Sequence, residues 1–389
     1  MRFITTFFLA ALVGLSSPVM GQSSDDDLQA YFNDGLKAYN AGDYEAAFKI
    51  MEYFAERGNA SGQHNLAGMY ERGHGVAQNL SKAAKWYRLA AEQGGAISQS
   101  IVGHLYSQGI GVVQDYSESA KWHRLAAEQG HATSQMALGL MYSEGRGVIQ
   151  DYSESAKWHR LAAEKGVASS QTIIGLMYSQ GNGVVQNYSE SAKWHHLAAE
   201  QGSGQSQQLL GEMYFQGRGV VQDYSESAKW HRLAAKQGIT ASQTALGLMY
   251  SAGRGVVQNY SESAKWHRLA AKQGAAKSQL LLGMLYSGGE GVVQNYSKAE
   301  KWYRRAAEQG EASAQYLLGT MYHAGAAVEQ STELAYILYS LATAQGYKGG
   351  VERREKALGA LSKSQINKSQ RIASEWQIGT PIPKTRDLN

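Results

Sequence analysis

The fold is decided by a stretch that recurs along the chain, and between Ala132 and Gly166 it reads ATSQMALGLMYSEGRGVIQDYSESAKWHRLAAEKG. Tryptophan returns every 36 residues, at Trp86, Trp122, Trp158, Trp194, Trp230, Trp266 and Trp302. A tyrosine keeps the same step from Tyr70 to Tyr322. A fixed period between about 20 and 50 residues is typical of solenoids, propellers and arrays. The sequence therefore predicts a repeat protein.

Each repeat has the pattern of two helices. The first is expected over Ala132–Glu144, because apolar or framework residues recur there at i, i+3, i+4 and i+7, and Gly145 ends it. The second begins after Asp151, whose side chain can accept the free N–H groups of the first turn. Glu154, three residues later, predicts a capping box with Asp151. Gly166 permits the left-handed conformation that ends this helix.

These residues resemble the Sel1-like repeat (SLR), a relative of the tetratricopeptide repeat. The shared pattern is Ala-x-Ser-Gln-x-x-Leu-Gly-x-x-Tyr, then Gly-x-Gly-Val, then Asp-Tyr-x-x-x-Ala-x-Trp-x-x-x-Ala-Ala-x-x-Gly, and it covers about residues 60–345 in eight copies. The resemblance implies an all-α fold, a right-handed α/α superhelical solenoid with the first helices on its concave side. Exported bacterial members are linked to envelope regulation, polysaccharide export, motility and host interaction, including binding of secretory immunoglobulin A.

The predicted organisation has five parts. Residues 59–346 hold the eight repeats, 22–58 a degenerate capping pair of helices (Leu28–Asn40 and Asp43–Arg57), and 347–376 two closing helices (Val351–Leu361 and Ser364–Trp376). Residues 377–389 form a tail. Solenoid ends need such caps, because the last repeat would otherwise expose its stacking face.

Residues 1–21 have the pattern of a signal peptide. Arg2 precedes an apolar run from Phe3 to Leu15, Pro18 breaks it, and cleavage is expected after Gly21. The run is too short to span a membrane, and the chain has no cysteine for lipid attachment. We therefore expect an exported protein, periplasmic or secreted, without membrane insertion.

Composition excludes several classes of function. With 43% hydrophobic and 18% charged residues the chain can form a large core, which argues against intrinsic disorder. The absence of cysteine excludes a disulfide framework, a thiolate metal site and a cysteine nucleophile. A net charge of +4 is too small to indicate binding to nucleic acid.

Comparing the repeats with one another separates the framework from a candidate binding surface. Counted from the glycine before the first helix, positions 5 (Gln) and 12 (Tyr) never change, whereas positions 3, 6, 10 and 13 vary and lie on one helical face. If this face lines a concave groove, it is a surface for a partner protein or an extended peptide. The candidate partner-binding residues are Met136, Leu140, Thr172, Leu176, Gln208, Glu212, Phe215, Thr244, Leu248, Leu280, Met284 and Tyr316. The alternative is that neighbouring first helices bury these side chains against each other.

Five histidines form a ladder, each directly after a repeat tryptophan: His123, His159, His195, His231 and His267. Tyr87 and Tyr303 occupy the same place near the ends, and a zinc ligand cannot alternate with tyrosine. We therefore predict packed rings and no metal site, with a loosening of the stack at low pH as a further hypothesis.

The repetition also argues against an enzyme. Catalysis needs one pocket with a unique set of residues, and each candidate Ser, His or Glu here recurs in several copies. We predict no catalytic residues and no cofactor. A non-enzymatic interaction module or scaffold is favoured, a peptidoglycan-binding or glycan-binding envelope protein is the alternative, and a hydrolase is the least favoured.

The two ends differ in charge. Residues 22–57 carry eight acidic and three basic side chains, whereas residues 347–389 carry nine basic and four acidic ones. Opposite charges of this kind are either solvated caps or the basis of weak head-to-tail self-association.

Overall fold

The computed structural model describes residues 22–388, so the predicted signal peptide, residues 1–21, lies outside the described part. Within that part the chain forms twenty α-helices and one short 3-10 turn, and no strand, which confirms the all-α prediction. The chain divides into two compact units, one ending at Trp158 and one beginning at His159. No helix among the described residues is both long and apolar enough to cross a membrane.

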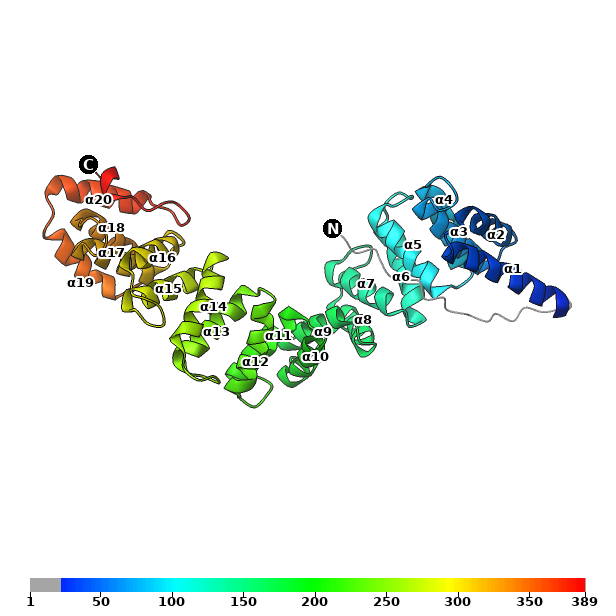
Figure 1. The fold of residues 1–389 in the computed structure, drawn as a ribbon, viewed down its shortest axis with the longest axis horizontal. Coiled ribbons are helices and arrows are strands. Elements are labelled where there is room, and N and C mark those ends of the chain that lie inside the picture. Colours follow the sequence, from blue (N-terminus) through cyan, green and yellow to red (C-terminus); the bar gives the residue numbers. More distant parts are fainter. Residues whose placement is uncertain (1–21, 389) are drawn as a thin grey trace. The chain divides into compact units, whose positions relative to one another are not determined.

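The first unit consists of helix pairs stacked in chain order (Figure 1). Its helices are α1 (Gln22–Asn40), α2 (Tyr44–Glu56), α3 (Ala60–Arg72), α4 (Leu80–Glu92), α5 (Ala96–Gln108), α6 (Tyr116–Glu128), α7 (Ala132–Glu144) and the first half of α8 (Tyr152–Glu164). Each helix from α1 to α6 packs against the next one along the chain. The core contains Met51, Leu66 and Met69, which are almost completely buried.

The second unit continues the same arrangement. Its repeat helices are α9 (Ala168–Gln180), α10 (Tyr188–Glu200), α11 (Gly204–Gln216), α12 (Tyr224–Lys236), α13 (Thr240–Ala252), α14 (Tyr260–Lys272), α15 (Ala276–Gly288), α16 (Tyr296–Glu308), α17 (Ala312–Ala324) and α18 (Thr332–Ala344). The closing elements are α19 (Gly349–Leu358), α20 (Lys363–Glu375) and the 3-10 turn η1 (Thr385–Asp387). Both closing helices pack on α18, whose apolar residues are buried on all sides.

Glycines make the link between the two helices of a repeat. Gly145 ends α7 with a φ of 68°, a left-handed conformation that glycine adopts without strain. Gly147 has a φ of 70°, and a Cβ added to it would lie 2.0 Å from the carbonyl oxygen of Tyr116. The loop therefore lies directly on the N-terminus of α6, the second helix of the preceding repeat. This contact holds neighbouring repeats together at the loop side.

Asparagine or aspartate caps the second helices. The Asp115 Oδ1 accepts hydrogen bonds from the N–H groups of Ser117 and Glu118 at 2.8 and 3.0 Å. Asparagine does the same in other repeats, at Asn79, Asn187, Asn259 and Asn295. A capping bond of this kind contributes about 1 kcal/mol to helix stability.

Candidate interaction surface

A buried glutamine connects the ends of three helices in most of the repeat junctions. In the second unit the Gln207 Nε2 donates to the Ala199 carbonyl oxygen at 3.0 Å, and its Oε1 accepts from the Gln237 Nε2 at 2.8 Å. These contacts join α10, α11 and the end of α12. The donation to an alanine carbonyl recurs at Gln99, Gln135, Gln171, Gln243, Gln279 and Gln315. The unchanging position 5 is thus a hydrogen-bonding framework.

The histidine ladder is buried behind the first helices. His231 is 2% exposed, its Nδ1 lies 3.1 Å from the Ser242 Oγ, and a Cβ on Gly211 would lie 2.9 Å from its ring. The same His–Ser hydrogen bond joins His123 to Ser134, His159 to Ser170, His195 to Ser206 and His267 to Ser278. Burial lowers the pKa of each of the five rings to about 4, so they are neutral at pH 7.

Tyrosine takes the place of histidine at the seventh repeat. Tyr303 is 3% exposed, and a Cβ on Gly283 would lie 2.6 Å from its ring. Its hydroxyl group lies 3.1 Å from the Ser287 Oγ. Residues 22–388 contain no cluster of three or more potential ligands that could hold a metal ion. The ladder position is therefore filled by packed aromatic rings of either kind.

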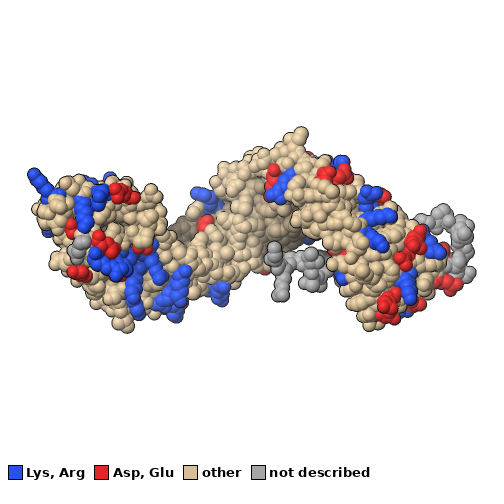
Figure 2. Space-filling view, turned by 90° about the horizontal axis from the view of Figure 1, so that it is seen from above, with Lys and Arg blue, Asp and Glu red and all other residues tan. Residues whose placement is uncertain are grey.

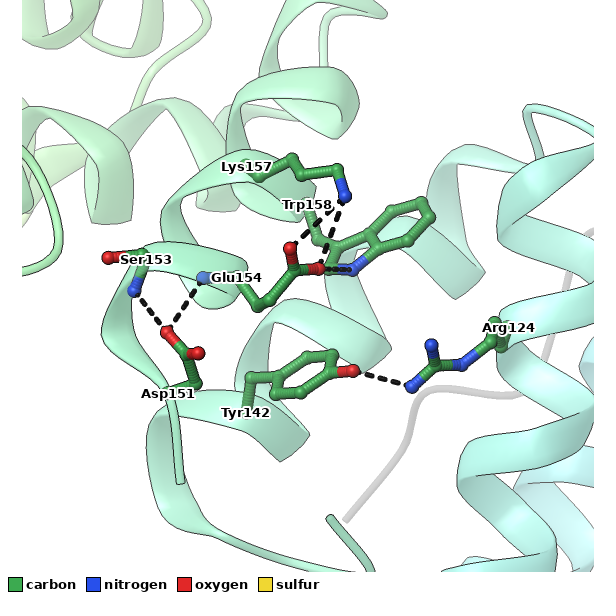
Figure 3. Close-up of polar contacts among 7 residues, drawn as sticks. All are labelled: Arg124, Tyr142, Asp151, Ser153, Glu154, Lys157 and Trp158. Atoms are coloured by element: carbon green, nitrogen blue, oxygen red, sulfur yellow. Dashed lines mark hydrogen bonds and ion pairs between the residues drawn. The ribbon is translucent and has the colours of Figure 1, made fainter. Parts of the chain in front are cut away.

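In four repeats the tyrosine at position 12 accepts a hydrogen bond from an arginine of the preceding repeat. In Figure 3 the Arg124 guanidinium points at the Tyr142 hydroxyl group, with 2.5 Å between Nη2 and Oη. The same pairing is found between Arg232 and Tyr250, Arg268 and Tyr286, and Arg304 and Tyr322. This contact crosses from a second helix to the next first helix, so it fixes how consecutive repeats stack.

The predicted capping box between Asp151 and Glu154 is wrong in one half. Asp151 does accept from the N–H groups of Ser153 and Glu154, at 2.8 and 3.1 Å (Figure 3). Its own N–H, however, already donates to the Tyr142 carbonyl oxygen at 3.0 Å. The Glu154 carboxylate instead accepts from Lys157 at 3.2 Å and from the Trp158 Nε1 at 3.1 Å. The loop geometry thus removes the donor that a capping box needs.

The candidate residues at position 6 lie between neighbouring first helices. The Thr172 Oγ1 lies 2.8 Å from the Ser206 Oγ, and the Thr244 Oγ1 lies 2.9 Å from the Ser278 Oγ. Thr172 and Leu280 are buried, so these two side chains are packing residues and cannot contact a partner, contrary to their assignment from sequence. Met136, Gln208, Thr244 and Tyr316 are half-buried.

The candidate residues at position 10 of the first helices are exposed or half-buried. We call those of the second unit the position-10 row: Leu176, Glu212, Leu248 and Met284; Leu140 has the same position in the first unit. Leu140, Leu248 and Met284 are 37%, 39% and 47% exposed. Leu176 and Glu212 are half-buried, and Glu212 accepts from the Gln208 Nε2 at 2.9 Å. In the second unit the row thus presents an acid between apolar side chains.

The two aromatic candidates take part in internal packing. Phe215 meets Tyr224 edge to face with ring centroids 5.1 Å apart. Tyr316 lies against Tyr339 and Tyr347, at 5.6 and 4.9 Å. Both residues are half-buried, so they remain partly accessible to a partner.

The most exposed large apolar side chains are not among the residues predicted from sequence as a binding surface. They lie in the loops between the two helices of six consecutive repeats and are 87–91% exposed: Val113, Ile149, Val185, Val221, Val257 and Val293. We call them the loop row. Their constancy at one repeat position looks like framework in the sequence, because constancy alone does not separate a buried residue from an exposed one.

The chain matches known repeat proteins over most of its length. A family model described as Sel1 repeat matches eight consecutive segments between residues 60 and 347. A sequence search of the curated proteins found no match.

Two solved structures are similar in both sequence and fold. One is a protective antigen of uropathogenic Escherichia coli strains with an SLR fold, 30% identical over 91% of this chain and 84% of that chain, with a TM-score of 0.66. The other is a Sel1 repeat protein from Oxalobacter formigenes, 29% identical over 89% of this chain and 97% of that chain, with a TM-score of 0.60. Sel1 repeats typically mediate contacts between proteins and are generally not enzymes. With eight matching repeats, this chain belongs to the Sel1 repeat family.

Proposed function

We propose that this protein is an exported, non-enzymatic interaction module that binds a partner protein or an extended segment along the position-10 row. The observation that carries the proposal is the exposure of Leu248 and Met284 at the same position of consecutive first helices. Apolar side chains that recur on one face and are not needed in the core are typical of binding surfaces.

The surroundings of the row support a rigid, preformed surface. The first helices are held by the buried glutamines and by the contacts Thr172–Ser206 and Thr244–Ser278. Packed helices lie about 8–10 Å apart, so the row in α9, α11, α13 and α15 extends over roughly 25–30 Å. Little ordering of the protein is then needed on binding, which favours affinity.

The chemistry of the row indicates what the partner presents. We expect the partner to present apolar side chains to Leu176, Leu248 and Met284. The flexible side chain of methionine can adapt to apolar side chains of different shape. Between these side chains the partner should present a hydrogen-bond donor or a cation to Glu212, because the Glu212 carboxylate would otherwise lose its solvation on binding without compensation. A segment with apolar residues on either side of one lysine or arginine fits this pattern.

Export is supported by the sequence of residues 1–21, with Arg2, the apolar run Phe3–Leu15 and the break at Pro18. The related E. coli protein is described as a protective antigen. A role in envelope regulation or in host interaction, such as binding of secretory immunoglobulin, follows from these two points as part of the proposal.

The experiment compares matched pairs of substitutions in the second unit. Leu248→Asp/Met284→Asp places two charges in the position-10 row, and Val221→Asp/Val257→Asp places two charges in the loop row at more exposed sites. Both variants should keep the helical content and the melting temperature within a few degrees, because all four side chains are at least one-third exposed.

The purified proteins are then used to capture partners from envelope extract and from secretions. The proposal expects a protein that binds wild type and the loop-row variant and that is lost with the position-10 variant. Equal capture by all three proteins contradicts it. Retention on insoluble peptidoglycan without any captured protein would favour the glycan-binding alternative, and hydrolysis of that material would favour the hydrolase.

A further inference from the structure

The C-terminal tail folds back along α16 in the second unit. After α20, the Gly379 N–H donates to the Glu308 carbonyl oxygen at 2.7 Å, and the Ile382 N–H donates to the Glu308 carboxylate at 3.2 Å. The Arg304 Nη1 donates to the Ile382 carbonyl oxygen at 3.0 Å, and the Ile382 side chain is 2% exposed. The tail is thus an ordered part of the cap.

The tail, α16, α17 and the loop after α17 line a shallow cavity of about 450 Å³ that is wide open to solvent. Four cationic side chains line it, Lys301, Arg304, Lys384 and Arg386, together with the acids Glu300 and Glu329. Figure 2 shows Lys and Arg side chains gathered over this end of the chain.

Only part of this positive charge is neutralised inside the cavity. Glu300 is paired with Arg304, with 2.7 Å between Oε1 and Nε, and Arg386 is paired with Asp387, with 3.6 Å between Nε and Oδ1. Lys301 stands where the lysines of five earlier repeats pair with a glutamate three residues before them, as Lys265 does with Glu262 at 2.5 Å. In the seventh repeat that glutamate is replaced by Lys298, so this partner of Lys301 is missing.

The opposite end of the chain carries exposed acidic residues. Asp25, Asp26 and Asp27 lie in the first turns of α1 and are all exposed. Leu28 and Tyr31, directly after them, are 42% and 41% exposed, although both are large apolar residues. The tail beside the basic cavity exposes an apolar residue as well, Ile378. The two ends therefore carry opposite charges, and each exposes apolar side chains beside its charged residues.

We infer that the basic cavity at the C-terminal cap receives the segment Asp25–Asp27 of a second copy of this chain, so that copies associate head to tail. The carboxylates pair with Lys301 and Lys384, which line the cavity from α16 and from the tail. A contact between two different surfaces does not close on itself, so each added copy offers a new free end. The association is electrostatic and therefore depends on ionic strength.

The test measures the mass of the purified protein by sedimentation velocity over a concentration series. At 50 mM NaCl the mean mass should rise above that of one chain as concentration increases, and at 500 mM NaCl it should return to that of one chain. Two variants each remove one half of the contact: Lys301→Gln/Lys384→Gln and Asp25→Asn/Asp26→Asn/Asp27→Asn. Each alone should weaken association at least tenfold.

An equimolar mixture of these two variants gives the sharpest result. One variant keeps the acidic segment and the other keeps the basic cavity, so the mixture should form a one-to-one dimer and nothing larger. A matched control, Lys236→Gln/Lys272→Gln, removes two exposed lysines from α12 and α14 and should associate like wild type.

Several outcomes would overturn the inference. These are a wild-type mass of one chain at both salt concentrations, an unchanged association in either variant, or a mixture that stays monomeric. A synthetic peptide of residues 22–34 contains the acidic segment and should dissociate the wild-type assemblies by competing for the cavity. If that peptide binds the cavity while the protein remains monomeric, the occupant is an acidic segment of another protein, and the proposed second copy is wrong.

Discussion

The histidine ladder makes a quantitative prediction about acid stability. His267 is 1% exposed, and burial lowers its pKa from 6.5 to about 4. Between these values the unfolded chain binds a proton that the folded chain does not, so stability falls as pH decreases from about 6.5 to about 4. At pH 5 one such ring costs about 2 kcal/mol of unfolding free energy, and at pH 7 almost nothing. His159, His195 and His231 act in the same direction in this unit.

The seventh repeat shows which substitution removes this cost without breaking the packing. There Tyr303 replaces histidine and Ala314 replaces the serine that the ring contacts. The double variant His267→Tyr/Ser278→Ala copies that arrangement. Ser251 has the same position relative to residue 267 as Ser287 has relative to Tyr303, so it can form a hydrogen bond with the new hydroxyl group. Thr244, which contacts Ser278, keeps its bond to the Thr240 carbonyl oxygen.

The assay is thermal and urea unfolding of wild type and variant at pH 7 and pH 5. The variant should lose about 2 kcal/mol less than wild type over this interval, which corresponds to about 4–8 °C in melting temperature for a unit of this size. Ser278→Ala alone keeps the ring and should keep the wild-type pH dependence. Equal losses for wild type and the double variant would refute the reasoning, because His267 would then not be a neutral buried ring.

Three further predictions concern the framework. Ala327 has a φ of 56° where the other repeats have glycine, so Ala327→Gly should stabilise the second unit by about 1 kcal/mol in urea unfolding. A lower free energy of unfolding in the variant would show that the backbone at Ala327 is not strained. Gln207→Leu removes its bonds to the Ala199 carbonyl oxygen, which keeps the Gly202 N–H at 3.0 Å, and to the Gln237 Nε2. The loss of these two hydrogen bonds should cost about 1–2 kcal/mol, whereas the exposed Gln237→Leu should cost less than half of that; equal costs would argue against the framework role. Asp151→Ala removes the N-cap of α8 and should lower the free energy of unfolding by about 1 kcal/mol. Glu154→Gln should lower it by less, because the Glu154 side chain does not bond the Asp151 N–H. A larger cost for Glu154→Gln than for Asp151→Ala would show that the capping box exists.

The helices inside the repeats could be predicted from sequence because local signals decide them. Residues 132–144 were expected as a helix and form α7 with the same bounds, since Gly145 ends it in a left-handed conformation. The outer helices agree less closely: the helix expected at Leu28 begins at Gln22, and those expected at Val351 and Ser364 begin at Gly349 and Lys363. These elements occur once, so no repetition fixes their ends.

The candidate surface could be predicted only in part. Positions 6 and 10 both vary and lie on one helical face, and nothing within one helix shows which of them meets the next repeat. Which of the two positions is buried depends on contacts with residues 34 positions further along the chain, such as the contact of Thr172 with Ser206. The return of the tail onto Glu308 likewise rests on contacts more than 70 residues apart in the chain. Sequence periodicity does not encode such contacts, so the basic cavity could not be foreseen.

The most direct test of the central claim is site-specific photo-cross-linking in envelope extract and secretions. A photoreactive side chain is placed at Leu248 in the position-10 row or at Val257 in the loop row, nine residues further along the same repeat. We predict a protein adduct from position 248 and none of the same mass from position 257. An adduct from position 257 alone, or none from either, would contradict the assignment of the position-10 row as the binding surface.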